Sequence, residues 1–148
     1  MTNIQITTII DNHAPSSPLS GEHGLSILIE IDKKMILMDV GQSNLFAENA
    51  KTLGINLEEI TDLIISHGHY DHTGGLQAFF DNNTTANIYI HPAGLKNKLN
   101  VNKYIGIPEQ FKNTIKQRAT MITTNTEIIK NIHLITNIKI YNQELTNF

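Results

Sequence analysis

The feature that most constrains this chain is a run of histidines that directly follows a short apolar segment. Residues 63–65 have the continuous apolar character of a buried strand, and they lead into the segment HGHYDHTGG, residues 67–75. Three imidazoles and one carboxylate stand within six positions of this segment. We interpret it as a functional site at the end of a strand rather than as a surface turn that happens to contain histidines.

The spacing of these side chains is typical of metal ligands. His67 and His69 are two residues apart, so on extended backbone their side chains lie on one side of the chain. Asp71 and His72 follow where the chain turns, so they can face a second ion nearby. Neutral imidazoles and carboxylates bind zinc, iron or manganese, and the chain has no cysteine to supply a thiolate or a disulfide. We therefore expect these four residues to bind one or two ions, zinc in the first place.

Composition excludes several other classes of protein. The length of 148 residues suits one domain, which we expect to span 1–148. The net charge is -3 and no run of Lys or Arg forms a basic patch, so a nucleic-acid partner is not expected. No apolar stretch is long enough to span a membrane, and the N-terminus has no positively charged, apolar leader. A cytoplasmic location is the expectation.

Apolar periodicity predicts strands with interspersed helices, which is the α+β or α/β class. The expected strands are 4–10, 25–31, 35–38, 63–65, 87–90, 121–123, 127–130, 132–135 and 138–141, and the expected helices are 43–53, 75–80 and 108–118. Strands 25–31 and 35–38 are expected to form a hairpin. The polar segment 95–103 is expected to be a loop or a short helix.

The sequence HGHYDH matches the H-x-H-x-D-H signature of the metallo-β-lactamase superfamily. With residues 22–26, 38–43 and 66–76 it resembles the branch of proteins like dihydropterin-ribofuranosyl-aminobenzene-phosphate synthase. The resemblance covers residues 5 to 110 and implies an αββα sandwich, a mixed β-sheet with flanking helices. It implies that His67 and His69 bind a first metal and that Asp71 and His72 bind a second. Asp39 matches an aspartate at a strand end that supports the ligands from behind.

The resemblance also implies an activity. A metal-dependent hydrolase or related transferase would act on a phosphorylated or other anionic small molecule through a metal-bound hydroxide. Asp71 would be the catalytic residue that orients this hydroxide.

Four other polar residues stand near the expected site. Ser66 and Thr73 flank the ligands and can hydrogen-bond within the site, although local backbone capping explains them equally well. His23 follows a long loop, and His91 ends a strand. Both are candidates for binding the substrate, with an ordinary loop histidine as the alternative for each.

The family pattern requires further ligands that this sequence does not supply. The resemblance implies a later histidine, a bridging aspartate and a final histidine, but after His91 the only histidine is His133, and no aspartate follows Asp81. We therefore expect the chain to correspond to the N-terminal half of the fold, as a partial domain. It would be a fragment, a half that dimerises, or a decayed relative.

Two consequences follow from an incomplete ligand set. Four ligands shared between two ions leave two for each, fewer than the three usual for a catalytic zinc, so weak or single-ion occupancy is expected. The alternative function is then a catalytically silent domain that binds metal or a partner chain. Half a sandwich also leaves one apolar sheet face bare, which predicts a homodimer or a higher oligomer.

Overall fold

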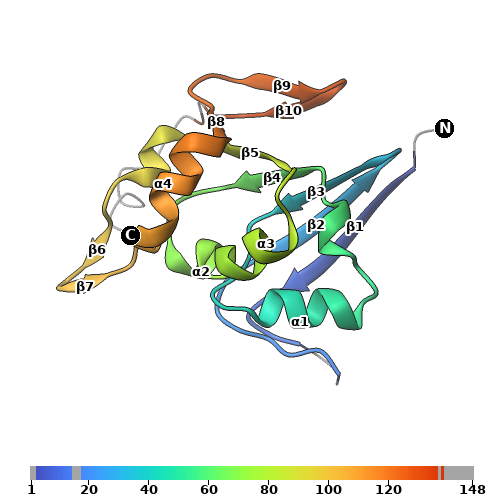
Figure 1. Ribbon diagram of the computed structural model, residues 1–148, viewed down its shortest axis with the longest axis horizontal. Helices are drawn as coiled ribbons and strands as arrows, with labels where there is room; N and C mark the ends of the chain where they lie inside the picture. The colour runs from blue at the N-terminus through green and yellow to red at the C-terminus, as the bar shows by residue number, and fades with distance from the viewer. Residues whose placement is uncertain (1–2, 15–17, 137, 139–148) are drawn as a thin grey trace.

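The computed structural model describes residues 3–14, 18–136 and 138 of the chain (Figure 1). Its strands are β1 (Ile4–Ile10), β2 (Ser26–Ile31), β3 (Lys34–Met38), β4 (Asp62–Ile65), β5 (Asn87–Ile90), β6 (Leu99–Asn100), β7 (Lys103–Tyr104), β8 (Ala119–Met121), β9 (Thr126–Ile129) and β10 (Ile132–Leu134). Its helices are α1 (Leu45–Thr52), α2 (Tyr70–Thr73), α3 (Leu76–Asn82) and α4 (Glu109–Arg118), with short 3-10 turns η1 (Leu57–Glu59) and η2 (Pro92–Leu95).

Six of the strands form one mixed sheet in the order β1-β2-β3-β4-β5-β8. The first three strands pair antiparallel, and β3, β4, β5 and β8 are parallel neighbours. The tight turn between β2 and β3 places Asp32 at a φ of 53°, a left-handed conformation that aspartate tolerates better than most residues. The parallel strands bring the carboxyl ends of β3, β4 and β5 to one edge of the sheet, where the histidine motif begins.

The helices cover one face of the sheet and form the main core with it. Leu28, Leu37, Leu63 and Ile88 are directly paired across β2, β3, β4 and β5, and all four are buried. They belong to one apolar cluster with Phe46 and Phe79, the largest fully buried side chains of α1 and α3. Burial of this row is what holds β4, and therefore the start of the motif, in place.

The opposite face of the sheet is also apolar, but it is only partly covered. Ile29 and Ile36 lie next to each other on it, and Met38 and Ile64 form the next pair along the strands. Residues of β10 and of the segments beside it line a hollow of about 650 Å³ together with this face. The sequence predicts a bare apolar face, whereas the described residues show one that is covered in part: Ile36 is 1% exposed and Ile4 is 57% exposed.

Most of the predicted elements are confirmed, and the α+β class with them. The predicted strand 121–123 is displaced by two residues to Ala119–Met121, because Ala119 and Thr120 pair with Ile88 and Tyr89 in the parallel ladder. The predicted loop or helix at 95–103 was wrong in part, since it contains β6 and the start of β7. The predicted strand 138–141 lies outside the described residues. No helix in the described part of the chain has the length and apolar character needed to cross a membrane.

Candidate metal centre

The motif starts where β4 ends and is shaped by a close backbone contact. After Ile65 the chain runs through residues 66–69 and then enters the single-turn helix α2. Gly68 lies against η2 so tightly that an added Cβ would stand 1.8 Å from the carbonyl oxygen of Gly94. Only glycine allows two backbone segments to lie this close together. His67 and His69 therefore stand on either side of a buried glycine.

The four predicted metal ligands lie together at this edge of the sheet. The Nε2 atom of His67 is 3.0 Å from Nδ1 of His69. The rings of His67 and His72 have centroids 4.1 Å apart. The Nε2 atom of His72 lies 3.4 Å from Oδ2 of Asp71. Each of the four side chains therefore contacts another member of the set.

Asp39 stands behind this cluster at the end of β3. Its side chain has no exposed surface, and its φ of 58° turns the backbone so that the carboxylate faces the motif. Oδ1 accepts the backbone N–H of Ser66 at 2.8 Å, and Oδ2 accepts the Ser66 hydroxyl at 2.6 Å. Oδ2 is also 2.8 Å from Nδ1 of His72. The structure thus joins Asp39 to both the start and the end of the motif.

The environment sets the protonation of the histidines. Burial, followed by the neighbouring charges of His72 and His69, lowers the pKa of His67 below its ordinary value. Burial, followed by the charge of Lys98, lowers the pKa of His69 as well. Both rings are therefore neutral near pH 7, the form that binds a metal. Burial alone would lower the pKa of His72, but the hydrogen bond and charge of Asp39 outweigh it and raise that pKa.

His23 reaches the cluster from a loop far away in the sequence. Its Nε2 atom is 3.3 Å from Oδ2 of Asp71. The loop is held there because the backbone of Gly24, at a φ of 135°, lies so close that an added Cβ would stand 2.1 Å from the carbonyl oxygen of Asp71. The side chain of His23 remains largely exposed, so it faces solvent at the rim of the site.

The carboxylate of Glu22 fastens the same loop on its other side. Its oxygens accept the backbone N–H of Ser43 at 3.0 Å, the Ser43 hydroxyl at 2.6 Å and the backbone N–H of Gln42 at 2.9 Å. These contacts fix residues 22–24 against the segment that follows Asp39.

The remaining predicted site residues lie around the cluster in different roles. The Ser66 hydroxyl is 2.9 Å from Nδ1 of His67, besides its bond to Asp39. The Thr73 hydroxyl is buried and donates to the backbone carbonyl of His69, four residues earlier, at 2.8 Å, so it bonds within the α2 turn. The Nδ1 atom of His91 accepts the N–H of Ala93 and so begins η2, while its exposed ring lines a small hollow with Ser66 and His67.

The imidazole and carboxylate groups of this cluster are suitable ligands for a divalent metal. Their arrangement does not surround a single point where an ion would lie. Within the described ranges, no group of three or more His, Asp or Glu side chains is placed around a common point suited to an ion. The close pairs His67–His69 and His72–Asp71 each offer two donors. The residues that would hold an ion are therefore these four, and weak occupancy stays a prediction.

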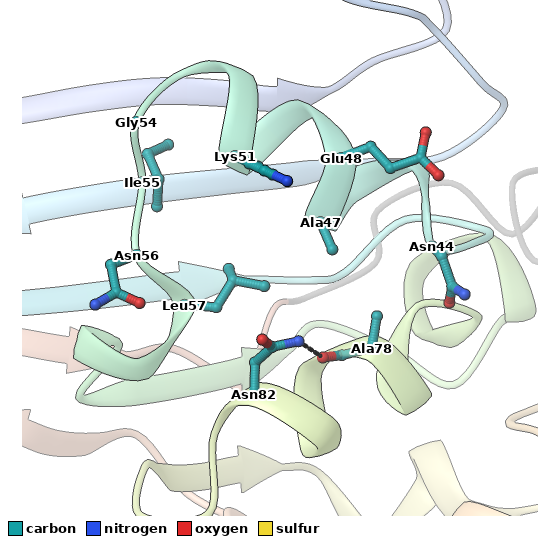
Figure 2. A pocket seen from close by; sticks show the side chains of 10 residues that line it. All are labelled: Asn44, Ala47, Glu48, Lys51, Gly54, Ile55, Asn56, Leu57, Ala78 and Asn82. Carbon is teal, nitrogen blue, oxygen red and sulfur yellow. Dashed lines mark hydrogen bonds between the residues drawn. The ribbon is translucent and has the colours of Figure 1, made fainter.

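The hollows of the described part of the chain differ in whether they adjoin the motif. A cleft of about 1010 Å³ is bordered by His23, His69 and Asp71. Another hollow of about 540 Å³ lies between α1, η1 and α3 (Figure 2). Its lining residues are Asn44, Ala47, Glu48, Lys51, Gly54, Ile55, Asn56, Leu57, Ala78 and Asn82. None of them is a histidine or belongs to the motif, so we assign this second hollow no part in the site.

Comparison with known sequences identifies the family. A sequence model described as the metallo-beta-lactamase superfamily matches residues 19–110. The chain belongs to the metallo-beta-lactamase superfamily. The match contains Asp39, the histidine motif and His91, so the residues that the structure gathers at this edge lie within the family region.

Individual relatives agree with this assignment. An uncharacterised protein of Methanocaldococcus jannaschii, MJ0448, is 33% identical over 117 residues, covering 78% of this chain and 45% of that protein. The 7,8-dihydropterin-6-methyl-4-(beta-D-ribofuranosyl)-aminobenzene-5'-phosphate synthase of the same organism is 41% identical over 100 residues, covering 61% of this chain and 33% of the synthase. The chain thus spans less than half the length of these two relatives.

A solved structure shows the same fold. The crystal structure of Tm1679, described as a metal-dependent hydrolase of the beta-lactamase superfamily, has a TM-score of 0.71 and 32% identity. The similarity covers 90% of this chain and 48% of Tm1679. The predicted resemblance to the superfamily and to its synthase-like branch is confirmed by these comparisons together.

Sequence reasoning missed the residues across the cleft from the motif. Lys98 and Lys103 border the cleft that contains His69 and Asp71, yet the segment that carries them was expected to be a loop or a helix. The alternation of Lys, Leu, Asn and Val in residues 98–102 was the available signal for a strand. Asn12, whose side-chain oxygen is 3.3 Å from Nδ1 of His23, carries no comparable signal.

Proposed function

We propose that this chain carries the metal-binding part of a hydrolase, or a related transferase, that acts on a phosphorylated or other anionic small molecule. The observation that supports this proposal most is the meeting of His67, His69, Asp71 and His72 at the carboxyl end of β4, with Asp39 behind them. The family assignment supports the hydrolytic class, and the relative named as a synthase of a 5'-phosphate supports a phosphorylated substrate.

The residues around the cluster have separable roles in this proposal. When Nδ1–H of His72 donates to Asp39, the tautomer is fixed and Nε2 is left as the ligand atom. A divalent ion bound there would polarise substrate oxygens and make water more acidic. Oδ2 of Asp71, close to both His72 and His23, is the oxygen that would accept a hydrogen bond from the attacking water and orient it. His23 and His91 would contact the substrate at the rim.

A second candidate function is a catalytically silent domain that binds metal or a partner chain. The observation that favours it is that the described side chains form no group of three ligands around one point. A site with two protein ligands per ion binds weakly and leaves several positions open. A hydrolase turns over a substrate and a silent domain does not. Activity measured together with metal content therefore distinguishes the two candidate functions.

The test compares the wild type with Asp71→Ala, and uses Asp81→Ala as the matched control. Asp81 is an exposed carboxylate on α3 that accepts a hydrogen bond from Gln77, outside the cluster. Each protein is assayed with p-nitrophenyl phosphate and bis(p-nitrophenyl) phosphate at increasing zinc, iron or manganese, and bound metal is measured by elemental analysis. We expect activity that requires added metal and falls about 100-fold or more in Asp71→Ala, as for loss of a positioned acid–base group.

Equal activity in the wild type and Asp71→Ala would reject the hydrolase proposal. Metal binding without any turnover in the wild type would favour the silent domain. Two tightly held ions per chain would contradict the expected weak occupancy. The zinc identity of the ion and the cytoplasmic location stay predictions of the sequence.

A further inference from the structure

The large cleft beside the motif has two walls of different origin. One wall is the motif itself, with His69, Tyr70 and Asp71, and the other is the small β6–β7 hairpin. The volume of the cleft, about 1010 Å³, is at the upper end of what small-molecule sites in proteins provide. The side chains of the hairpin wall are not among the predicted metal ligands, so metal binding does not explain their position in the cleft.

Two lysines supply the charge of this cleft. Lys98 and Lys103 both line it, and Asp71 is the one acidic residue among the described residues that do so. In the described part of the chain neither lysine forms an ion pair with a carboxylate. Lys103 Nζ lies 5.7 Å from the ring centroid of Tyr70, and Lys98 also borders the small hollow beside His67 and His91. Among the described residues that line it, the cleft therefore has two lysines and one carboxylate, an excess of positive charge.

The hairpin is attached firmly to the motif. The backbone N–H of Tyr70 donates to the carbonyl of Ile105 at 3.0 Å, and the N–H of Ile105 donates to the carbonyl of Lys98 at 3.0 Å. Further along, Asn100 pairs with Lys103 across the hairpin. Both lysine backbones are thus held at fixed positions relative to α2, as expected of a preformed binding wall rather than of free surface side chains.

The tip of the hairpin is apolar and exposed. Leu99 and Val101 line the cleft and have 67% and 89% of their surface exposed. Val101 also adopts a φ of 54°, a left-handed conformation that is unfavourable for a β-branched residue. Strained backbone conformations such as that of Val101 occur often at positions that contact a ligand.

We propose that the β6–β7 hairpin is the substrate-recognition wall of this site, with Lys98 and Lys103 binding the phosphate group of a small molecule and Leu99 and Val101 contacting its apolar part. Two ammonium groups match the two negative charges of a phosphate monoester better than the single charge of a carboxylate. That the bound molecule is a substrate rests on the proposed function, whereas phosphate binding itself does not.

The first test measures binding of phenyl phosphate and of inorganic phosphate to the full chain, freed of metal by dialysis, using isothermal titration calorimetry. We compare the wild type with Lys98→Ala, Lys103→Ala and the double variant, and use Lys96→Ala and Lys116→Ala as controls on exposed lysines outside the cleft. Loss of one charge-assisted hydrogen bond predicts about tenfold weaker binding for each cleft lysine. The control variants are expected to bind like the wild type.

A second arm tests the position of the ligand and the apolar tip. Amide resonances of residues 98–104 are expected to shift when phenyl phosphate is added. Lys98→Arg, which keeps the charge, is expected to restore binding. Val101→Asn suits the left-handed conformation, so the fold is kept, but the preference for phenyl phosphate over inorganic phosphate should disappear.

The binding experiments test the recognition wall separately from the proposed hydrolase activity. Wild-type binding that is absent, or is unchanged in the double lysine variant, would overturn the recognition wall. Benzoate bound as tightly as phenyl phosphate would overturn the preference for phosphate. Lysine-dependent phosphate binding in a protein without metal-dependent turnover would keep the recognition wall and reject only the hydrolase.

Discussion

At the scale of single residues, Asp39 links the start of the motif to its end. It is fully buried, and its two oxygens are shared among the Ser66 backbone, the Ser66 hydroxyl and His72. A buried carboxylate is stable only when such partners compensate for the loss of water. The same contacts that stabilise the carboxylate also orient the His72 ring.

Replacement of Asp39 with Asn tests this coupling. An amide keeps the size of the side chain, but its NH₂ group cannot accept hydrogen bonds from both Ser66 and His72. Zinc affinity should fall about 10- to 100-fold, the usual result of removing a partner behind a ligand. Competition with a chromophoric chelator measures this, and Asp32→Asn in the exposed β2–β3 turn is the control. Unchanged zinc affinity would show that His72 does not depend on Asp39.

Gly68 provides a second prediction at this scale. Its missing Cβ is the space into which the Gly94 carbonyl fits, so Gly68→Ala must push apart two backbone segments. We expect a loss of about 3 kcal/mol in the free energy of unfolding, measured in urea. Gly54→Ala is the control, because nothing lies within 4 Å of an added Cβ there and only the positive φ, 74°, costs about 1 kcal/mol. Similar losses in both variants would contradict the close contact.

At the scale of elements, the segments around the site are joined by buried polar side chains. Asn83, which follows α3, is 2% exposed. Its amide group donates to the carbonyls of Leu57 at 2.8 Å and Ile60 at 2.9 Å, and its oxygen accepts the N–H of Ala86 at 2.8 Å. One side chain thus connects η1, the start of β4 and the start of β5.

Asn83→Ala should therefore destabilise the fold far more than an exposed substitution. Three or more buried partners would lose their hydrogen bonds, which predicts a loss of about 3 kcal/mol in the free energy of unfolding. Urea unfolding followed by circular dichroism measures it. Asn82→Ala, which removes one exposed bond to the Ala78 carbonyl, should cost about 0.5 kcal/mol or less. If both variants unfold alike, Asn83 does not hold these elements together.

At the scale of the whole molecule, β1 is the edge of the sheet with the features of a pairing surface. Between Ile4 and Ile10 it contains no charge and no proline, the two devices that usually block edge-to-edge pairing. Ile4 and Ile6 are 57% and 66% exposed and lie on the incompletely covered face. Two copies of a neutral strand do not repel each other, so β1 can pair with β1 of a second chain. Antiparallel pairing of two identical strands would give a symmetric dimer.

The self-association expected from the sequence stays a prediction, and Ile6→Lys tests this location for it. A lysine there would place two like charges together in a β1–β1 pair, so a wild-type dimer should become a monomer in sedimentation velocity. Leu53→Lys, at the end of α1 and 39% exposed, should leave the dimer intact. A wild-type monomer at all concentrations would contradict self-association, and an intact Ile6→Lys dimer would contradict this edge.

Features that depend on residues close together in the chain were predictable from the sequence. Strand β4 and the motif after it are contiguous, so their apolar run, spacing and glycines were enough to predict that His67, His69, Asp71 and His72 share one edge. The resemblance to the family added Asp39 and His23. The hairpin β2–β3 and strand β5 were predicted because their apolar patterns and turns are local.

How distant segments meet at that edge depends on the fold of the whole chain. The bond between Asp39 and His72 spans 33 positions of sequence, and it exists because β3 pairs with β4 in one register. Lys98 and Lys103 reach the cleft because the Tyr70 N–H binds the Ile105 carbonyl, a contact that no local pattern encodes. Strand register and backbone contacts over long separations follow from packing of the whole chain, so one sequence read locally does not determine them.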